Sequence, residues 1–225
     1  MSLPVARPDP RESRPRPRRL RQHTNPLAFQ GAREPPDWHA VMGGPPEELE
    51  IGFGLGELLL ARAAMRPSAR ILGIDVRWAY VERCREALAR LDRPLPHLHF
   101  LHAEGTLCLR EWLAPASLRH VVVYFPDPWF KKRHHKRRII NATTRGLLVR
   151  VLRPGGLLHV ATDQQMLAAE IMELLTATDG LRNEMGPGRY APHAVLGARS
   201  GREADHAARG HRIWRLLFRR TGSPA

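Results

Sequence analysis

The sequence predicts an α/β fold in which helices cover both faces of a doubly wound, mostly parallel sheet. From Glu48 onward, short apolar segments alternate with segments whose apolar residues recur at helical spacing. One segment, LRHVVVYF (118–125), is almost wholly apolar, as expected for a central parallel strand buried on both faces. With 225 residues, 43% of them hydrophobic, the chain can bury the core of one such domain. Ligands of such sheets bind at the carboxyl ends of the strands.

The expected elements follow one another along the chain. Strands are expected where short apolar runs end in a turn or a polar residue: ELEIGFG (48–54), ARILGIDV (69–76), HLHFLHAEG (97–105), LRHVVVYF (118–125), LLHVATD (157–163) and HRIWRLLFRR (211–220). Helices are expected at ELLLARAAM (57–65), YVERCREALARL (80–91), IINATTRGLLVRVL (139–152) and QQMLAAEIMELLTAT (164–178). The segment RPGG (153–156) predicts a turn before the fifth strand.

An excess of positive charge indicates a polyanionic partner. The chain has 36 Lys and Arg against 22 Asp and Glu, a formal net charge of +14, and this balance favours nucleic acid. No apolar run approaches the roughly 18 residues of a transmembrane helix and no secretory segment is recognisable, so we expect a cytoplasmic protein without a membrane partner. Cys84 and Cys108 lack companions at metal-ligand spacing; we expect reduced packing residues and no metal site.

Composition divides the chain into two parts. Residues 1–18 are rich in Arg and Pro and are expected to form a flexible basic arm, either a solubilising tail or an RNA contact. Residues 19–225 are expected to form a single domain. Both a homodimer and a partner subunit are compatible with this organisation.

The first chemical motif is the glycine-rich turn EIGFGLGEL after the first expected strand. Gly52 and Gly54 let the backbone turn sharply and let a ligand approach closely. A dinucleotide-binding turn would have glycine where Glu57 stands, and Glu50 adds a second carboxylate, so a diphosphate ligand is disfavoured. The ammonium and sulfonium of S-adenosylmethionine suit both charges. The alternative is a structural turn without a ligand.

Two further acids follow the next two strands. Asp75 ends the second strand, about where doubly wound nucleotide-binding folds place an acid for ribose hydroxyls, and Glu104 follows the third strand, where it could meet the adenine. Taken singly, Asp75 could cap a helix and Glu104 could be an ordinary loop acid. Together with Glu50 they predict a cofactor pocket at the carboxyl edge of the sheet.

The most specific stretch is YFPDPWFKKRHHKRR (124–138). Its two prolines restrict the backbone on either side of Asp127, so this carboxylate is expected to point stiffly toward the cofactor cleft. Trp129 and Phe130 could stack on a base or could simply pack the loop.

Basic residues fill the rest of that stretch. Six cations lie within eight residues, and their mutual repulsion predicts contact with phosphate or water: Lys131, Lys132, Arg133, Lys136, Arg137 and Arg138. His134 and His135 have no metal-spaced companions, so we interpret them as facing RNA or solvent.

These motifs, in this order and spacing, resemble the tRNA (guanine-N7-)-methyltransferase family, whose members modify guanosine at position 46 in the variable loop of tRNA. The resemblance rests on EIGFGLG, GIDV, YFPDPWFKKRHHKRR and ATD and covers residues 47–220. It implies a seven-stranded, Rossmann-like class I methyltransferase fold, S-adenosylmethionine as the methyl donor and tRNA as the substrate.

Matching motif positions also implies the site residues. The cofactor-binding residues are Glu50, Gly52, Gly54, Asp75, Glu104 and Asp127, and Asp127 is also the proposed catalytic residue. The substrate-binding residues are Lys131, Arg133, His134, His135, Lys136, Arg137, Arg138, Asp163, Ser200 and Glu203.

The chain departs from the family pattern near its C-terminus. Where family members have Thr-x-aromatic-Glu, this chain has SGRE, with Ser200 for Thr and Arg202 for the aromatic, and Asp205 stands where a basic residue is usual. Upstream, RQHTNPL (21–27) resembles the eukaryotic branch of the family, so residues 19–27 are expected to be ordered.

Elementary chemistry suggests a role for Asp127 other than that of a general base. Guanine N7 is unprotonated at neutral pH and can attack a methyl sulfonium directly. Methyl transfer moves positive charge onto the purine, so a carboxylate that accepts the guanine N1 and N2 hydrogens would bind more tightly as the reaction proceeds. Asp127 is therefore interpreted as a guanine reader and an electrostatic stabiliser.

Three rival interpretations remain open from the residues. An exocyclic-amine methyltransferase has a related motif, although Trp129 stands where its second proline belongs. A non-catalytic RNA-binding protein is favoured by the C-terminal departures but opposed by the intact pocket acids. A nicotinamide oxidoreductase is disfavoured by Glu50 and Glu57.

Overall fold

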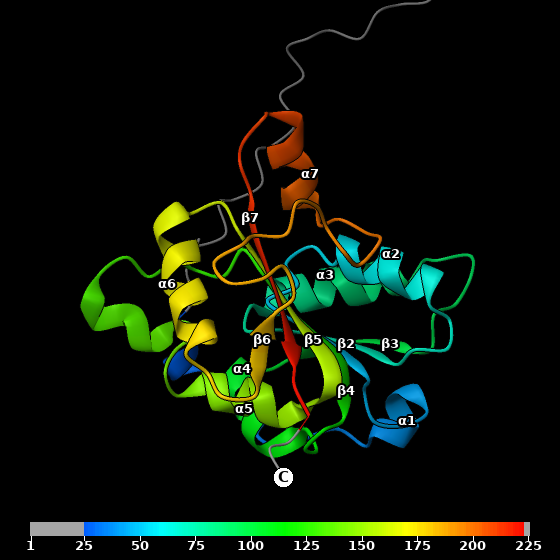
Figure 1. Ribbon diagram of the computed structural model, residues 1–225. Coiled ribbons are helices and arrows are strands. Elements are labelled where there is room, and N and C mark those ends of the chain that lie inside the picture. The colour runs from blue at the N-terminus through cyan, green and yellow to red at the C-terminus, as the bar shows by residue number, and fades with distance from the viewer. Residues whose placement is uncertain (1–24, 223–225) are drawn as a thin grey trace, which may run out of the picture.

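One seven-stranded sheet forms the centre of the computed structural model, which describes residues 25–222 (Figure 1). Its strands are β1 (Glu48–Ile51), β2 (Ile71–Asp75), β3 (Leu98–His102), β4 (Leu118–Tyr124), β5 (Leu152–Thr162), β6 (Leu181–Asn183) and β7 (Trp214–Arg220). They are ordered β3-β2-β1-β4-β5-β7-β6, with β1 to β5 parallel and β7 antiparallel to both its neighbours. The predicted doubly wound, mostly parallel sheet is confirmed. The predicted basic arm, residues 1–18, lies outside the described residues.

Helices connect these strands. They are α1 (Trp38–Met42), α2 (Glu57–Met65), α3 (Trp78–Ala89), α4 (Gly105–Leu107), α5 (Thr144–Val151), α6 (Gln165–Thr176) and α7 (Gly201–Ala208), with 3-10 turns η1 (Pro26–Ala28) and η3 (Lys132–Arg137) and a π-helical turn η2 (Cys108–Trp112). Within the part of the chain that the structure describes, no helix is long and apolar enough to cross a bilayer.

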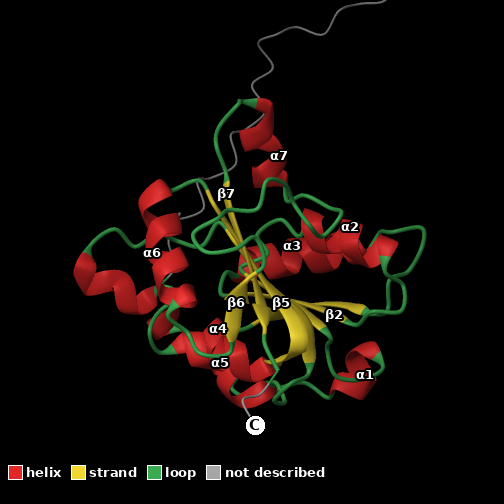
Figure 2. Cartoon of the chain, in the orientation of Figure 1, coloured by secondary structure: helices red, strands yellow, loops and turns green. Residues whose placement is uncertain are grey.

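The two faces of the sheet are packed by different helices, as Figure 2 shows. Along β4, Val121 and Val123 belong to the larger core, which also contains side chains of α5 and α6. The alternate residues Val122 and Tyr124 pack on the opposite face against Leu58 of α2. Because both faces of β4 are buried, its near-continuous apolar sequence is explained.

Two expected boundaries were wrong. The helix expected at 139–152 begins only at Thr144, because the Asn141 side chain accepts hydrogen bonds from the Thr143 and Thr144 amides and turns the chain there. The expected turn RPGG (153–156) lies inside β5 as a bulge, where the register against β4 shifts. β6, α1 and α7 were not expected; each is short, with three, five and eight residues respectively.

A buried ion pair fastens β1 to α2. The Arg62 guanidinium donates to both carboxylate oxygens of Glu48, at 2.8 and 2.9 Å, and to the carbonyl oxygen of Leu196 at 3.0 Å. Next to it, the rings of His120 and His159 share a hydrogen bond of 3.0 Å. Burial lowers the pKa of His120 to about 4 and that of His159 to about 3, so both rings are neutral at physiological pH.

We expect Glu48→Gln to lower the free energy of unfolding by about 3 kcal/mol, because it leaves a guanidinium buried without its counter-charge. Urea denaturation measures this. The matched control is Glu86→Gln, which removes an Arg–Glu pair whose side chains are 76% and 55% exposed, and it should change stability by no more than about 0.5 kcal/mol. Equal effects of the two substitutions would show that the buried pair has no special role.

Candidate active site

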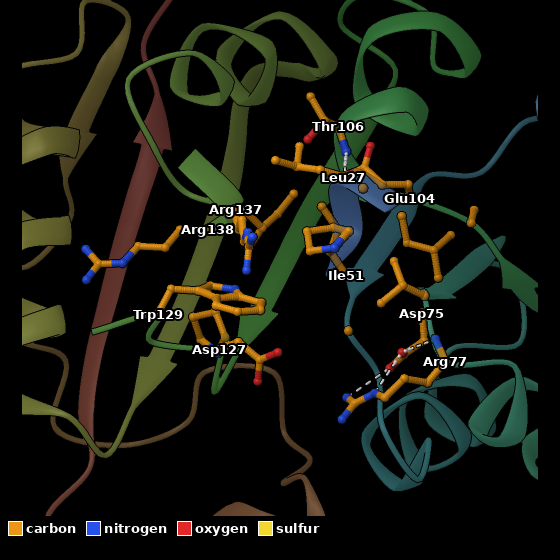
Figure 3. A pocket seen from close by; sticks show the side chains of 18 of the residues that line it. Leu27, Ile51, Asp75, Arg77, Glu104, Thr106, Asp127, Trp129, Arg137 and Arg138 are labelled. Atoms are coloured by element: carbon orange, nitrogen blue, oxygen red, sulfur yellow. Dashed lines mark hydrogen bonds and ion pairs between the residues drawn. The ribbon is translucent and has the colours of Figure 1, made fainter. Parts of the chain in front are cut away.

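A pocket opens where the carboxyl ends of β1, β2 and β4 meet (Figure 3). The strand order reverses between β1 and β4, and such switch points are where doubly wound sheets bind ligands. Seven residues of the predicted site line this pocket: Gly52, Asp75, Glu104, Asp127, Lys136, Arg137 and Arg138. Glu50 and Gly54 do not line this pocket; Glu50 lies on β1, and Gly54 lies in the turn that follows it and donates its amide to Asp75 in the pocket wall.

Glu50 carries a buried carboxylate without compensation. It is 2% exposed, and its Oε2 has no hydrogen-bond partner among residues 25–222. Burial, and then the charges of Asp75 and Glu57, raise the pKa of Glu50 to about 8. A donor that also carries positive charge would stabilise the ionised form of this group. An ammonium supplies both, whereas a sulfonium has no hydrogen to donate, so the residues present fit a cofactor with an ammonium.

The glycine turn leaves room for that ligand. Gly52 and Gly54 adopt φ of 82° and 57°, and a Cβ added to either would meet no atom within 4 Å. Their φ values favour glycine, and the open space beside them lets a ligand approach the backbone. Gly56, in contrast, has no open space beside it: a Cβ there would lie 2.8 Å from the Cys84 sulfur, so a larger residue would clash.

Asp75 and Glu104 hold the backbone that shapes the pocket. Asp75 accepts hydrogen bonds from the Gly54 amide at 3.2 Å and the Arg77 amide at 2.9 Å, and it pairs with the Arg77 guanidinium at 3.2 Å. The N-cap of α3 is Arg77, not Asp75. Glu104 caps α4 by accepting the amides of Thr106 and Leu107 at 2.9 and 2.8 Å. Both acids therefore combine a structural contact with a place in the pocket wall.

Asp127 faces the same pocket from the loop that follows β4. Figure 3 shows Asp127 and Asp75 approaching the pocket from opposite sides. The loop around Asp127 is strained, with φ of 49° at Phe125 and 41° at Trp129, values that bulky side chains rarely adopt. Trp129 packs against the Arg137 guanidinium, 5.0 Å from its ring centroid. The indole thus packs the loop while also lining the pocket.

The basic run was not expected to be helical, but Lys132–Arg137 forms η3, which projects beside α6 in Figure 1. The turn divides the run into two classes of residue. Lys131, Lys132, Arg133 and Lys136 are exposed, whereas His134, His135, Arg137 and Arg138 are partly buried. Phe130, at 71% exposed, stands beside the exposed cations.

The structure places the three predicted C-terminal substrate residues in internal contacts. Asp163, after β5, pairs with Arg202 at 2.8 Å and with His206 at 3.3 Å. Ser200 caps α7 by accepting the Glu203 amide at 3.2 Å. Glu203 is fully buried and pairs with Arg215 at 2.6 Å.

Arg202 stands where family members have an aromatic residue, and its side chain packs against the aromatic ring of Phe125. Its guanidinium lies 4.9 Å from the centroid of Phe125, at the end of β4. It thereby connects α7 to the loop that carries Asp127 through the ring of Phe125, and to the end of β5 through the carboxylate of Asp163.

The N-terminal segment contributes pocket residues that the sequence interpretation did not assign. Pro26 and Leu27 line the pocket beside Glu104. They belong to η1, whose preceding Asn25 accepts the Leu27 amide at 3.3 Å. They fall within RQHTNPL, so this motif was the available signal; residues 19–24 lie outside the described part. Across residues 25–222, no group of three His, Cys, Asp or Glu side chains could hold a metal ion.

The fold and the site define the class of protein. The seven-stranded sheet with antiparallel β7, the open glycine turn and the buried acid near its switch point fit a class I S-adenosylmethionine-dependent methyltransferase. Residues 45–216 match the family model described as "Putative methyltransferase".

The relatives identify the family. The tRNA (guanine-N(7)-)-methyltransferase of Xanthomonas campestris pv. campestris (strain 8004) is 39% identical over 195 residues, which cover 86% of this chain and 73% of the relative. The protein of that name from Burkholderia ambifaria is 38% identical over 190 residues, covering 84% and 73% of the two chains. The solved structure of the 16S rRNA methyltransferase KamB superposes with a TM-score of 0.55 at 17% identity, over 84% of this chain and 95% of that one, and supports the fold. The chain belongs to the tRNA (guanine-N7-)-methyltransferase family.

We expect cofactor binding at pH 6.5 to release about one proton per molecule, because Glu50, with a pKa of about 8, is protonated in the free protein and ionises against the cofactor's ammonium. Titration calorimetry with S-adenosylhomocysteine in buffers of different ionisation enthalpy measures the proton count. Glu50→Gln should release none. Identical proton counts in the two proteins would contradict the assignment.

Proposed function

We propose that the protein transfers a methyl group from S-adenosylmethionine to N7 of guanosine in tRNA, at position 46 of the variable loop. The observation that carries this proposal is the position of Asp127, which lines the cofactor pocket and begins the loop that leads into the exposed cations of η3. The family to which the chain belongs supports it. The cofactor, when bound, supplies the electrophilic methyl group.

Asp127 is the proposed reader of the guanine base. Its carboxylate can accept the N1 and N2 hydrogens, which only guanine offers in that arrangement. N7 attacks without losing a proton, so the chain has no need of a general base. As positive charge develops on the purine, the fixed negative charge of Asp127 stabilises it more strongly than it stabilises the substrate, and this difference is what accelerates the reaction.

Four exposed cations are the proposed phosphate contacts: Lys131, Lys132, Arg133 and Lys136. Their charges are not paired with acids in any ion pair identified within residues 25–222. Contacts of this kind give affinity that is independent of sequence and falls as salt rises. The specificity for one guanosine must then come from the pocket and from the shape of the tRNA.

Incubation of the protein with bulk tRNA and methyl-labelled S-adenosylmethionine tests the reaction. We expect the label in 7-methylguanosine after nuclease digestion, and none when the tRNA carries 7-methylguanosine already. Label in N2-methylguanosine would instead identify an exocyclic-amine methyltransferase. A protein that binds the cofactor and tRNA yet transfers no label would be a non-catalytic RNA-binding protein.

We expect Asp127→Asn to lower kcat/KM for tRNA about a hundredfold, because the amide keeps the shape of the carboxylate but loses its charge toward the purine. Affinity for S-adenosylhomocysteine should change far less. The matched control is the exposed Asp179→Asn, which should retain full activity. Full turnover by Asp127→Asn with unchanged base selectivity would show that Asp127 neither reads nor stabilises the guanine.

A further inference from the structure

Arg138 differs from the exposed cations of the basic segment in how it is held. Its side chain is only 11% exposed, and its guanidinium is engaged on three sides. Nε donates to the carbonyl oxygen of Pro128 at 2.8 Å, the second terminal nitrogen lies 3.0 Å from His135 Nε2, and the first forms an ion pair with Glu170. In Figure 3 its side chain points away from the pocket. A guanidinium in these contacts has few donors left for an RNA phosphate.

The contacts of Arg138 join a rigid element to the loop that carries Asp127. Pro128 directly follows Asp127, and its carbonyl group begins the peptide bond to Trp129. Glu170 belongs to α6, whose buried side chains pack in the larger core. Arg138 thus connects the backbone next to Asp127 to a helix fixed by the core.

The loop needs such a restraint. The φ of 41° at Trp129 is unfavourable for a tryptophan, and a strained backbone persists only where surrounding contacts hold it. Pro128 has no amide hydrogen, so its carbonyl is the polar backbone group through which the loop can be fastened at this residue. The planar fork of Arg138 reaches this carbonyl and the Glu170 carboxylate together.

We propose that Arg138 is a positioning residue that, together with Glu170, sets the place of the Asp127 carboxylate in the pocket, and that it does not bind tRNA phosphate. The inference rests on the proposed function, for which the position of Asp127 relative to guanine decides the rate. A displacement of about 1 Å can cost on the order of a hundredfold in rate.

Steady-state kinetics of Glu170→Gln separates positioning from phosphate binding. If Arg138 were a phosphate contact restrained by Glu170, removing the carboxylate would free it and lower KM for tRNA. If Arg138 instead positions Asp127, Glu170→Gln should lower kcat several-fold and leave KM unchanged. Glu173→Gln removes an exposed carboxylate of the same helix and controls for the change in net charge; it should leave kcat unchanged.

Variants of Arg138 complete the test. Arg138→Gln should lower kcat tenfold to a hundredfold, and Arg138→Lys should not restore it, because one ammonium cannot satisfy the Pro128 carbonyl and Glu170 together. The double variant Arg138→Gln/Glu170→Gln should be no slower than Arg138→Gln. Arg133→Gln, in the exposed class, should raise KM and flatten the salt dependence of binding while leaving kcat alone.

Amide hydrogen exchange of residues 127–131 in the RNA-free protein gives a readout that needs no catalysis. It should be faster in Arg138→Gln and Glu170→Gln than in wild type, and unchanged in Arg133→Gln. This measurement keeps the inference testable even if the protein methylates another nucleoside. A lower KM in Glu170→Gln beyond that of Glu173→Gln, full rescue by Arg138→Lys, or unchanged exchange in Arg138→Gln would each overturn the proposal.

Discussion

The site depends on one buried carboxylate that the protein itself does not neutralise. Burying an ionised carboxylate without a partner costs several kcal/mol, and a protein avoids this cost by keeping the group protonated until a cation arrives. Glu50 is in this state, since burial raises its pKa to about 8. On the proposed assignment of Glu50, a cationic ligand would complete this site. Asp75 and Glu57 add to the same negative field.

The parallel topology makes this arrangement possible. The register of β1 against β2 and β4 brings three strand ends to one edge, so that acids far apart in the chain surround one pocket. The sheet fixes only the strand ends, however, and Asp127 lies beyond the end of β4. Its position is set by contacts outside the sheet, through Arg138 to α6 on one side and through Arg202 to α7 on the other.

Sequence reasoning succeeded where the signal was local. The alternation of apolar runs and helical segments predicted the sheet, and with it the places of Glu50 near the end of β1 and Asp75 at the end of β2; their role toward a ligand stays a prediction. It could not divide the basic run into exposed and internally bonded residues, because the partner of Arg138 on α6 lies 32 residues away. In the same way, no local pattern shows that Glu203 is buried against Arg215 on β7.

The most direct test of this account compares the affinities of S-adenosylhomocysteine and its desamino analogue for wild type and for Glu50→Gln. The two ligands differ only in the ammonium. Neither has a sulfonium, so no second positive charge contributes to binding. We predict that wild type loses at least tenfold more affinity than Glu50→Gln when the ammonium is removed, as expected for a hydrogen bond between charged groups. An equal loss in both proteins would contradict the claim that Glu50 awaits the cofactor's cation.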